Sequence, residues 1–377
     1  MLFGHLNAQT TMLYPKNNKM KKIIYTLVLI TTTLSCSETV INQESTLLPL
    51  TETGGGEVLC QDLFYPIEII PLKETTEFHI RDIKKIENFN DEYYVLCNNS
   101  KNVLAVFSSS GNKIREIGRW GNGHGEYGQI YDFCIDKKNQ RIMILCANSL
   151  VKMYSLQGEY LTEKVISKSA LWNIATIDGN ILCTSNHQTF TNGEDAFLFY
   201  IFDENLNLIT KHTNVLSDYM GMFPLLTSLL KTAGNHYIYS DFYMHRIYIL
   251  DKMGEVTQIY NYDKKALMPS TLFKEYNLFT ENQFKYDFIL DNIVITDTIL
   301  SIYKVGQQVR IALNHRNGET IMNGPIKGPI PKLYTTDGNN LISVSTVEDL
   351  GKMSFINYDE KDESFFYVVR YKMNDLK

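Results

Sequence analysis

A short phrase that ends in a tight turn recurs along this sequence at a nearly constant spacing. The turns fall at Gly111, Gly158, Asn205, Gly254 and Gly318, so that successive spacings are 47, 47, 49 and 64 residues. Glycine and asparagine are the residues that most readily adopt the positive φ angles of tight hairpin turns. A period of roughly 40–50 residues made of short strands is typical of propeller blades. The repeat therefore predicts an all-β chain folded as a β-propeller.

The order of strands inside the repeat gives the number of blades. Within 130–166, four strand-like runs separated by turns predict one four-stranded antiparallel blade. The same pattern places blades one to five at 78–118, 119–167, 168–213, 214–262 and 263–324, and a sixth begins near 332. The sixth ends one strand short at 364–373, so we expect the earlier segment 62–72 to supply its outer strand and close the ring. A six-bladed propeller over 62–377 is predicted, since a seventh blade would need about 40 more residues.

The residues before the propeller are predicted to be a signal and a linker. Residues 1–35 form a signal region whose expected true start is Met20, because a short basic run there precedes an apolar run at 23–34. That run is too short to cross a bilayer as a helix. A serine and Cys36 follow, an arrangement that resembles the signal of bacterial lipoproteins, in which the cysteine is lipidated and becomes the first residue. Residues 36–61, rich in Ser, Thr, Glu and Gly, are then expected to be the lipidated cysteine and a flexible tether.

This signal also predicts where the protein resides. A lipidated Cys36 would anchor the chain in the cell envelope, with contact to the membrane only through the lipid. The sequence does not distinguish the periplasmic side of the outer membrane from the cell surface. An ordinary signal peptide cleaved at another position is the alternative.

The composition and the cysteines exclude several classes of function. The chain has 377 residues, 44% of them hydrophobic, and a net charge of −6, which gives no electrostatic footprint for nucleic acid. No CxxC pair occurs among the six cysteines, so neither a zinc site nor a dithiol redox site is predicted, and no cofactor is expected. Cys97, Cys146, Cys183 and Ser240 align at one repeat position, which predicts small buried side chains and reduced thiols.

The link between the first two blades is the most distinctive segment of the sequence, EIGRWGNGHGEYGQIYDFCID at 116–136. It resembles a phrase found in six-bladed β-propeller lipoproteins of Gram-negative, Bacteroides-type bacteria, a group distantly similar to NHL-repeat propellers. The residues that match the phrase are Gly118, Arg119, Gly121, Gly123, Gly125, Glu126, Tyr127 and Phe133. The resemblance implies the fold and an envelope location, and it carries over no catalytic residue.

Polar and aromatic loop residues are the candidates for binding. The link contains a GxGxxG pattern, but a strand rather than a helix is expected to follow it, which argues against a dinucleotide site. Links into inner strands and loops between second and third strands lie on one face of a propeller, so we expect a ligand or partner there, at the channel mouth. The candidates are Arg119, Trp120, His124, Glu126, Tyr127, Trp172, His187, Phe242, His245 and Arg246.

Two classes of function remain open. A non-enzymatic binding or scaffold module for an envelope protein, a peptide or a glycan is favoured, because catalytic motifs such as GxSxG and HExxH do not occur. The alternative is a metal-dependent hydrolase similar to the lactonases, six-bladed propellers that hold calcium in the central channel. Its oxygen ligands would be Asp82, Asp132 and Asn173, at the starts of the first three inner strands.

Overall fold

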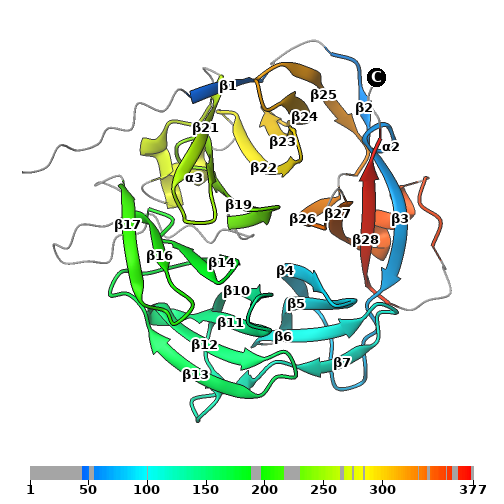
Figure 1. Cartoon of the computed structure of the whole chain (residues 1–377). Coiled ribbons are helices and arrows are strands. Elements are labelled where there is room, and N and C mark those ends of the chain that lie inside the picture. The colour runs from blue at the N-terminus through cyan, green and yellow to red at the C-terminus, as the bar shows by residue number, and fades with distance from the viewer. Residues whose placement is uncertain are drawn as a thin grey trace, which may run out of the picture. The chain divides into compact units, whose positions relative to one another are not determined.

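A ring of six β-sheets makes up most of the regular structure of this chain, as the computed structural model in Figure 1 shows. The described residues all belong to one unit, residues 43–377. They are 45–50, 55–99, 101–187, 197–215, 230–263, 267–273, 276–282, 285–329, 331–337, 340–353, 355–358 and 364–374. The signal region and Cys36 lie outside them. Among the described helices, none is long and apolar enough to cross a membrane.

Each sheet contains the four antiparallel strands predicted for a blade, which confirms the six-bladed propeller. Blade 1 consists of β4 (Asp82–Phe89), β5 (Glu92–Asn99), β6 (Lys101–Ser108) and β7 (Lys113–Glu116). Blade 2 consists of β10 (Ile130–Asp136), β11 (Arg141–Cys146), β12 (Leu150–Ser155) and β13 (Tyr160–Val165). Blade 3 consists of β14 (Asn173–Ile177), β15 (Asn180–Thr184), β16 (Phe197–Phe202) and β17 (Leu208–Asn214). Blade 4 contains β18 (Leu230–Ala233), β19 (His236–Asp241), β20 (Arg246–Leu250) and β21 (Val256–Asp263). Blade 5 contains β22 (Phe288–Ile295), β23 (Thr298–Val305), β24 (Gln308–His315) and β25 (Thr320–Lys327). Blade 6 contains β26 (Lys332–Asp337), β27 (Asn340–Thr346), β28 (Phe366–Met373) and β3 (Phe64–Pro71).

The remaining elements are short and lie in the links. A two-stranded parallel sheet, β8 (Arg119–Trp120) with β9 (Glu126–Tyr127), forms the glycine-rich link, and a strand follows it as expected. An insertion between blades 4 and 5 holds η2 (Ser270–Phe273) and α3 (Tyr276–Asn282). The other helical turns are α2 (Cys60–Leu63), η1 (Ala147–Ser149) and α4 (Val347–Lys352).

Apolar side chains on both faces of the middle strands pack the blades side by side. In β11, Ile142 and Ile144 belong to the core shared with blade 1, whereas Met143 and Leu145 belong to the core shared with blade 3. Successive side chains of a strand point to opposite faces, so a strand covered on both sides carries a continuous apolar run. The apolar second strand of each repeat thus specifies the stacking of blades around the ring.

The ring is closed by pairing between strands from the two ends of the chain. β3 pairs antiparallel with β28, with Ile69 opposite Val369 and Pro66 opposite Tyr371. Phe64 of β3 and Tyr371 of β28 lie in one buried core, with their ring centroids 5.8 Å apart. The segment expected to complete blade 6 is therefore in place, and its pairing removes the open edge of β28.

The segment expected to be a flexible tether contains two strands instead. β1 (Ser45–Pro49) pairs in parallel with β21 of blade 4, and β2 (Val58–Leu59) pairs in parallel with β25 of blade 5. Leu48 and Val58 are buried in the cores beneath these outer strands. The tether prediction through residue 61 is wrong for these strands, because their few apolar residues bury against the blades despite the polar composition around them.

Truncating Leu48 to alanine should lower the free energy of unfolding by about 2–5 kcal/mol, the usual cost of shortening a buried leucine. The side chain of Leu48 is 0% exposed, whereas Leu47 beside it is 55% exposed, so Leu47→Ala is a matched control that should have little effect. Urea unfolding followed by circular dichroism measures both variants. Equal, small losses would show that β1 does not hold to blade 4 in solution.

The described cysteines are Cys60, Cys97, Cys134, Cys146 and Cys183, and all are buried and free of disulfides. Cys97, Cys146 and Cys183 each face the core shared with the preceding blade. Burial raises the pKa of Cys97 and of Cys146 to about 12, so these thiols stay protonated. Ser240 does not share their position, since its Oγ donates to Oδ1 of Asn292 in the following blade at 2.6 Å. Ser240 stands four positions after the first residue of β19, whereas Cys97 and Cys146 stand five and Cys183 three positions after the first residues of their strands, so Ser240 points to the opposite face.

A charged cluster at β5, the second strand of blade 1, joins that blade to blade 2. The two terminal nitrogens of Arg115 donate to the Glu92 carboxylate at 2.8 and 2.5 Å, and its Nε donates to the Leu156 carbonyl at 2.9 Å. The Tyr94 hydroxyl donates to the same carboxylate at 2.9 Å. The Arg115 hydrogen bonds are the main cause of the lowered pKa of Glu92.

The stabilisation from Glu92 should therefore depend on pH. A carboxyl group whose pKa is lowered by folding stabilises the native state above its ordinary pKa of about 4.3 and loses that effect as pH falls through the lowered value. Glu92→Gln should reduce the free energy of unfolding at neutral pH, and the difference from wild type should shrink in acid. Urea unfolding across pH checks this, with the exposed Glu159→Gln as control. A difference that stays constant or grows in acid would contradict the assignment.

Candidate functional site

A cavity of about 440 Å³ lies at the centre of the ring, where the inner strands converge. Blades 1, 2, 3, 4 and 6 all contribute to its lining. It extends to the first turn of several blades, because Lys137, Asp178 and Asn235 in those turns also line it. These turns lie at the end of the strands opposite to the loops between second and third strands. This cavity thus reaches the face opposite to the predicted binding face.

Positive charge dominates the cavity lining, although the whole chain is acidic. The lysines in the lining are Lys84, Lys85, Lys137, Lys138 and Lys231, against two carboxylates, Glu87 and Asp178. In the inner strand DIKKIENF, at 82–89, Ile83 and Ile86 enter an inter-blade core, whereas Lys84, Lys85 and Glu87 line the cavity. The fold therefore directs charge towards the channel and apolar groups between blades.

Lys85 is neutralised inside the channel wall. Its Nζ lies 2.9 Å from Oδ1 of Asp132 and 3.3 Å from Oε1 of Glu87, and it donates to the Phe133 carbonyl at 2.7 Å. The other oxygen of Asp132 accepts from the backbone N–H of Ile174 at 3.0 Å, so the cluster joins blades 1, 2 and 3. Burial is the main cause of the raised pKa of Glu87.

Lys231 has an equivalent arrangement on the other side of the channel. Its Nζ lies 3.1 Å from Oδ1 of Asp291 and donates to the Asn292 carbonyl at 3.0 Å. Asp291 Oδ1 also accepts from the Asn292 N–H at 2.8 Å. Blade 4 and blade 5 are thus joined by a lysine whose charge is compensated.

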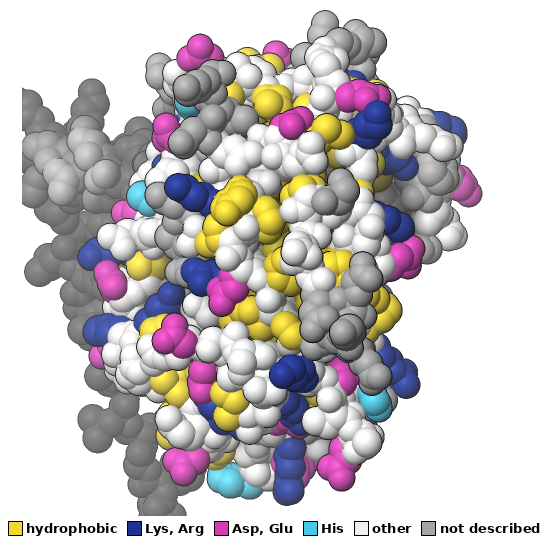
Figure 2. Space-filling model, turned by 90° about the vertical axis from the view of Figure 1, so that its right-hand side faces the viewer, with side chains coloured by type: hydrophobic (Ala, Val, Ile, Leu, Met, Phe, Trp, Pro, Cys, Tyr) yellow, Lys and Arg dark blue, Asp and Glu magenta, His cyan; other side chains and the backbone are white. Residues whose placement is uncertain are grey.

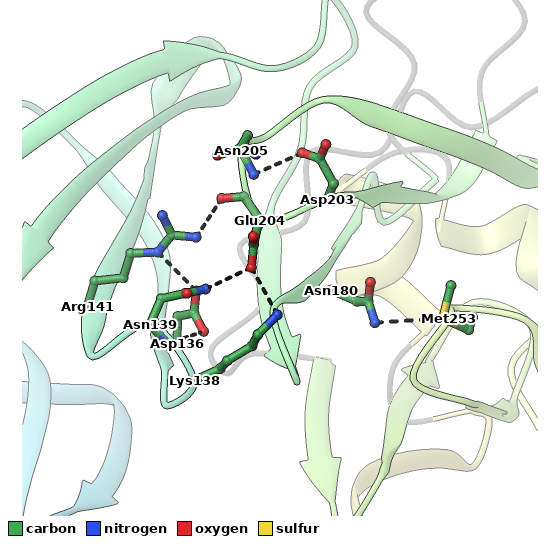
Figure 3. A network of polar contacts seen from close by, with 9 residues as sticks. All are labelled: Asp136, Lys138, Asn139, Arg141, Asn180, Asp203, Glu204, Asn205 and Met253. Atoms are coloured by element: carbon green, nitrogen blue, oxygen red, sulfur yellow. Dashed lines mark hydrogen bonds and ion pairs between the residues drawn. The ribbon is translucent and has the colours of Figure 1, made fainter.

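A network of polar contacts holds the turn that carries Lys137 and Lys138 at the cavity rim (Figure 3). Asp136 accepts from Arg141 Nε at 2.9 Å and from the Asn139 side chain at 2.8 Å. Lys138 pairs with Glu204 of blade 3 at 3.0 Å, and a terminal nitrogen of Arg141 donates to the Glu204 carbonyl at 2.5 Å. The rim of blade 2 is therefore fixed against blade 3.

The glycine-rich link does not lie at the channel mouth, which corrects the prediction for its residues. Tyr127 is fully buried between blades 1 and 2. The His124 ring packs edge-on against Tyr160 of the outer strand β13, with centroids 4.6 Å apart. Trp120 is 40% exposed, and the Lys101 ammonium lies 5.9 Å from its ring centroid. Parallel pairing of β8 with β9 folds the link back along the outer parts of the two blades.

The charged pair of the link has a structural role. Arg119 Nε lies 2.6 Å from Oε1 of Glu126, and the Gly123 N–H donates to Oε2 at 2.8 Å. That backbone hydrogen bond is the main cause of the lowered pKa of Glu126. A Cβ on Gly121 would lie 1.9 Å from the Glu126 carboxylate, so a side chain at this position would displace that carboxylate from the loop. The carboxylate therefore organises the loop around itself.

The remaining predicted residues belong to the other blades. Trp172 is half-buried and stacks on Tyr131, with centroids 4.3 Å apart. His187 is buried, and its Nε2 lies 2.9 Å from Oδ2 of Asp241, so the pair joins blades 3 and 4. Phe242 packs against the cores on both sides of blade 4.

His245 and Arg246 follow in the same hairpin. His245 Nε2 lies 2.7 Å from the Met268 carbonyl, and burial lowers the pKa of His245. Arg246 is half-buried and lies opposite Asp241 in the backbone pairing of β19 with β20. The predicted candidates are therefore divided between the outer link and inter-blade contacts, and none of them lines the cavity described above.

The three residues considered as calcium ligands do not converge. Asp82 is exposed, Asp132 is bonded to Lys85 and to backbone N–H groups, and Asn173 is buried and accepts from Thr184 Oγ1 at 3.2 Å. In the described part of the chain, no group of three or more His, Cys, Asp or Glu side chains is arranged to hold a metal.

Sequence reasoning missed the cavity lysines. Lysine pairs at 84–85 and 137–138 are visible in the sequence, one in an inner strand and one in a first turn. Charged residues in such places usually face solvent, so nothing local distinguishes them from a solvated surface. Only the packing of blade 1 against blade 2 brings them to one cavity.

Six four-stranded blades around one central cavity define a six-bladed β-propeller. The sequence matches the DUF5128 family, described as a 6-bladed beta-propeller, over residues 38–311, and the chain belongs to that family.

Two solved structures share the fold. A putative exported protein from Bacteroides fragilis has a TM-score of 0.68 and 16% identity, with 88% of this chain and 100% of that chain covered. A member of the DUF4221 family from Bacteroides vulgatus has a TM-score of 0.53 and 10% identity, with 82% and 98% covered. At these identities the likeness concerns the fold alone. A search of curated proteins found no match to this sequence.

Proposed function

We propose that this chain is a lipid-anchored propeller of the cell envelope that acts without catalysis, by holding a ligand in its central cavity. The observation that carries the proposal is the cavity itself, where polar groups from five blades converge within about 440 Å³. Concave sites with a few convergent polar groups are where small ligands usually bind. The ligand is a small polar molecule or the end of a peptide, a glycan or an envelope protein segment.

The charge balance of the cavity wall supports a cavity that binds a ligand rather than one that serves folding alone. A wall needed only for folding would be expected to neutralise its buried charges, as Lys85 and Lys231 are neutralised by Asp132 and Asp291. The cavity retains further cations at its rim, among them Lys137. Exported proteins of the same fold and the lipoprotein-like, NHL-like resemblance of 116–136 support an envelope role.

A cavity-filling variant tests this function. The chain from residue 37 onward is screened by thermal unfolding against small polar metabolites, short peptides and oligosaccharides. Because Thr176 lines the cavity, Thr176→Trp should abolish the stabilisation by any true ligand. Thr162→Trp, on the exposed face of β13, is the matched control and should keep it. Ligands that stabilise both variants equally would place binding elsewhere.

Lipid attachment is tested separately. Metabolic labelling with a palmitate analogue should mark the wild-type chain and Cys60→Ala, but not Cys36→Ala, because only a cysteine directly after the signal can receive the lipid. Cys60 is buried in the propeller and serves as the control. Undiminished label in Cys36→Ala would contradict the anchor.

A further inference from the structure

Three charged side chains meet in the channel wall at the junction of blades 1 and 2, and two of them are acids. Lys85 Nζ lies 2.9 Å from Oδ1 of Asp132 and 3.3 Å from Oε1 of Glu87. The side chains of Lys85 and Glu87 are 12% and 21% exposed, and that of Asp132 is 1% exposed. If both acids were ionised, the cluster would hold one negative charge more than Lys85 can neutralise. Such a charge is costly in a wall that water reaches only in part.

Hydrogen bonds distinguish the two acids of the cluster. Besides its ion pair, Asp132 accepts from the backbone N–H of Phe133 at 2.8 Å and from that of Ile174 at 3.0 Å. Glu87 accepts from the backbone N–H of Ile135 at the longer distance of 3.3 Å. Hydrogen bonds to a carboxylate favour its charged form. Asp132 is therefore the acid better held as an anion, and Glu87 is the one that can take a proton.

The other groups that face Glu87 do not supply a fixed positive charge. Cys134 of β10 is neutral, because burial raises the pKa of its thiol well above the usual value. Tyr94, opposite Glu87 in β5, is neutral because burial raises its pKa too. Lys137 is near enough to act on Glu87, but it is exposed, so water screens its charge. The other charged side chains lining this cavity each have a polar partner of their own, and they are Lys84, Lys138, Asp178 and Lys231.

Glu87 differs in its surroundings from the acids on the outside of the molecule. Figure 2 shows the flank on the right-hand side of Figure 1, where acidic side chains stand at the surface among basic and hydrophobic ones. Water stabilises the charge of such groups. For Glu87, burial is the main cause of a raised pKa, and the charge of Asp132 adds to it against the opposing effect of Lys85.

We propose that Glu87 is a pH switch in the channel wall, which takes up a proton where surface carboxyls are still ionised and so strengthens the junction between blades 1 and 2. With Glu87 protonated, the cluster holds one lysine and one carboxylate and is neutral. Lys85 and Glu87 of β4 both bond to the backbone of β10, so the charge of the cluster acts directly on this junction. Both side chains line the cavity, which gives protons a path to them. The switch needs no ligand, so it stands or falls independently of the proposed function.

Stability across pH tests the direction of the switch. A carboxyl group whose pKa is raised by folding stabilises the native state less as pH rises from about 4.3 through the raised value. Glu87→Gln stays neutral at every pH, so its urea midpoint minus that of wild type should increase with pH across this window. Glu92→Gln should change in the opposite direction, and the exposed Glu159→Gln should differ from wild type by a constant amount. A Glu87→Gln difference that stays constant or decreases with rising pH would overturn the switch.

Carbon NMR of the chain from residue 37 onward, labelled in the glutamate carboxyls, follows the proton itself. One resonance should titrate above the range of the others and be absent from Glu87→Gln. Because Lys137 favours the ionised form of Glu87, Lys137→Gln should move this titration to higher pH. Lys73→Gln removes the same charge from another exposed position and should leave the titration unchanged.

The two lysine variants change only exposed side chains, so they keep the test available even where Glu87→Gln does not fold. Absence of a carboxyl that titrates above the others would overturn the proposal. The same follows if that resonance persists in Glu87→Gln, or if Lys137→Gln and Lys73→Gln titrate alike, because the proton would then reside on another group.

Discussion

Pairing between β3 and β28 is the interaction on which the rest of the structure depends, because it turns a row of blades into a ring. Each blade buries its second and third strands against two neighbours, and an open row would leave one apolar face and one backbone edge uncovered. The N-terminal segment extends this closure, since β1 and β2 add a parallel fifth strand to blades 4 and 5. β1, β2 and β3 thus pair with strands of three consecutive blades.

Closure also creates the central cavity and its unusual charge. Blades 1, 2 and 4 place lysines around one volume, where like charges repel and burial disfavours ionisation. The structure offsets most of this cost with inter-blade pairs, Lys85 with Asp132 and Lys231 with Asp291. These pairs strengthen the contact between neighbouring blades in the same step, so the stability of the ring and the character of the cavity are coupled.

The glycine-rich link illustrates how a strong sequence signal can indicate fold without indicating a site. Its glycines fit around the Glu126 carboxylate, and Tyr127 fills the core between blades 1 and 2. The unusual composition of 116–136 therefore reflects tight packing at the periphery. Tyr127 could not be identified as a core residue from sequence, because an aromatic residue in a glycine-rich loop is equally compatible with exposure.

The sequence by itself determined the repeat, the six blades, the closing strand and the buried, reduced state of Cys97, Cys146 and Cys183, because turn spacing and strand alternation are local properties of a chain. It also contained Lys84 and Lys137, without any sign that they share a cavity. Only the tertiary structure decided that, because an inner strand of blade 1 and the first turn of blade 2 line one cavity only when the two blades pack side by side. Tertiary packing likewise decided that Leu48 is buried, because a short apolar stretch becomes a strand only when an outer strand is present to pair with it.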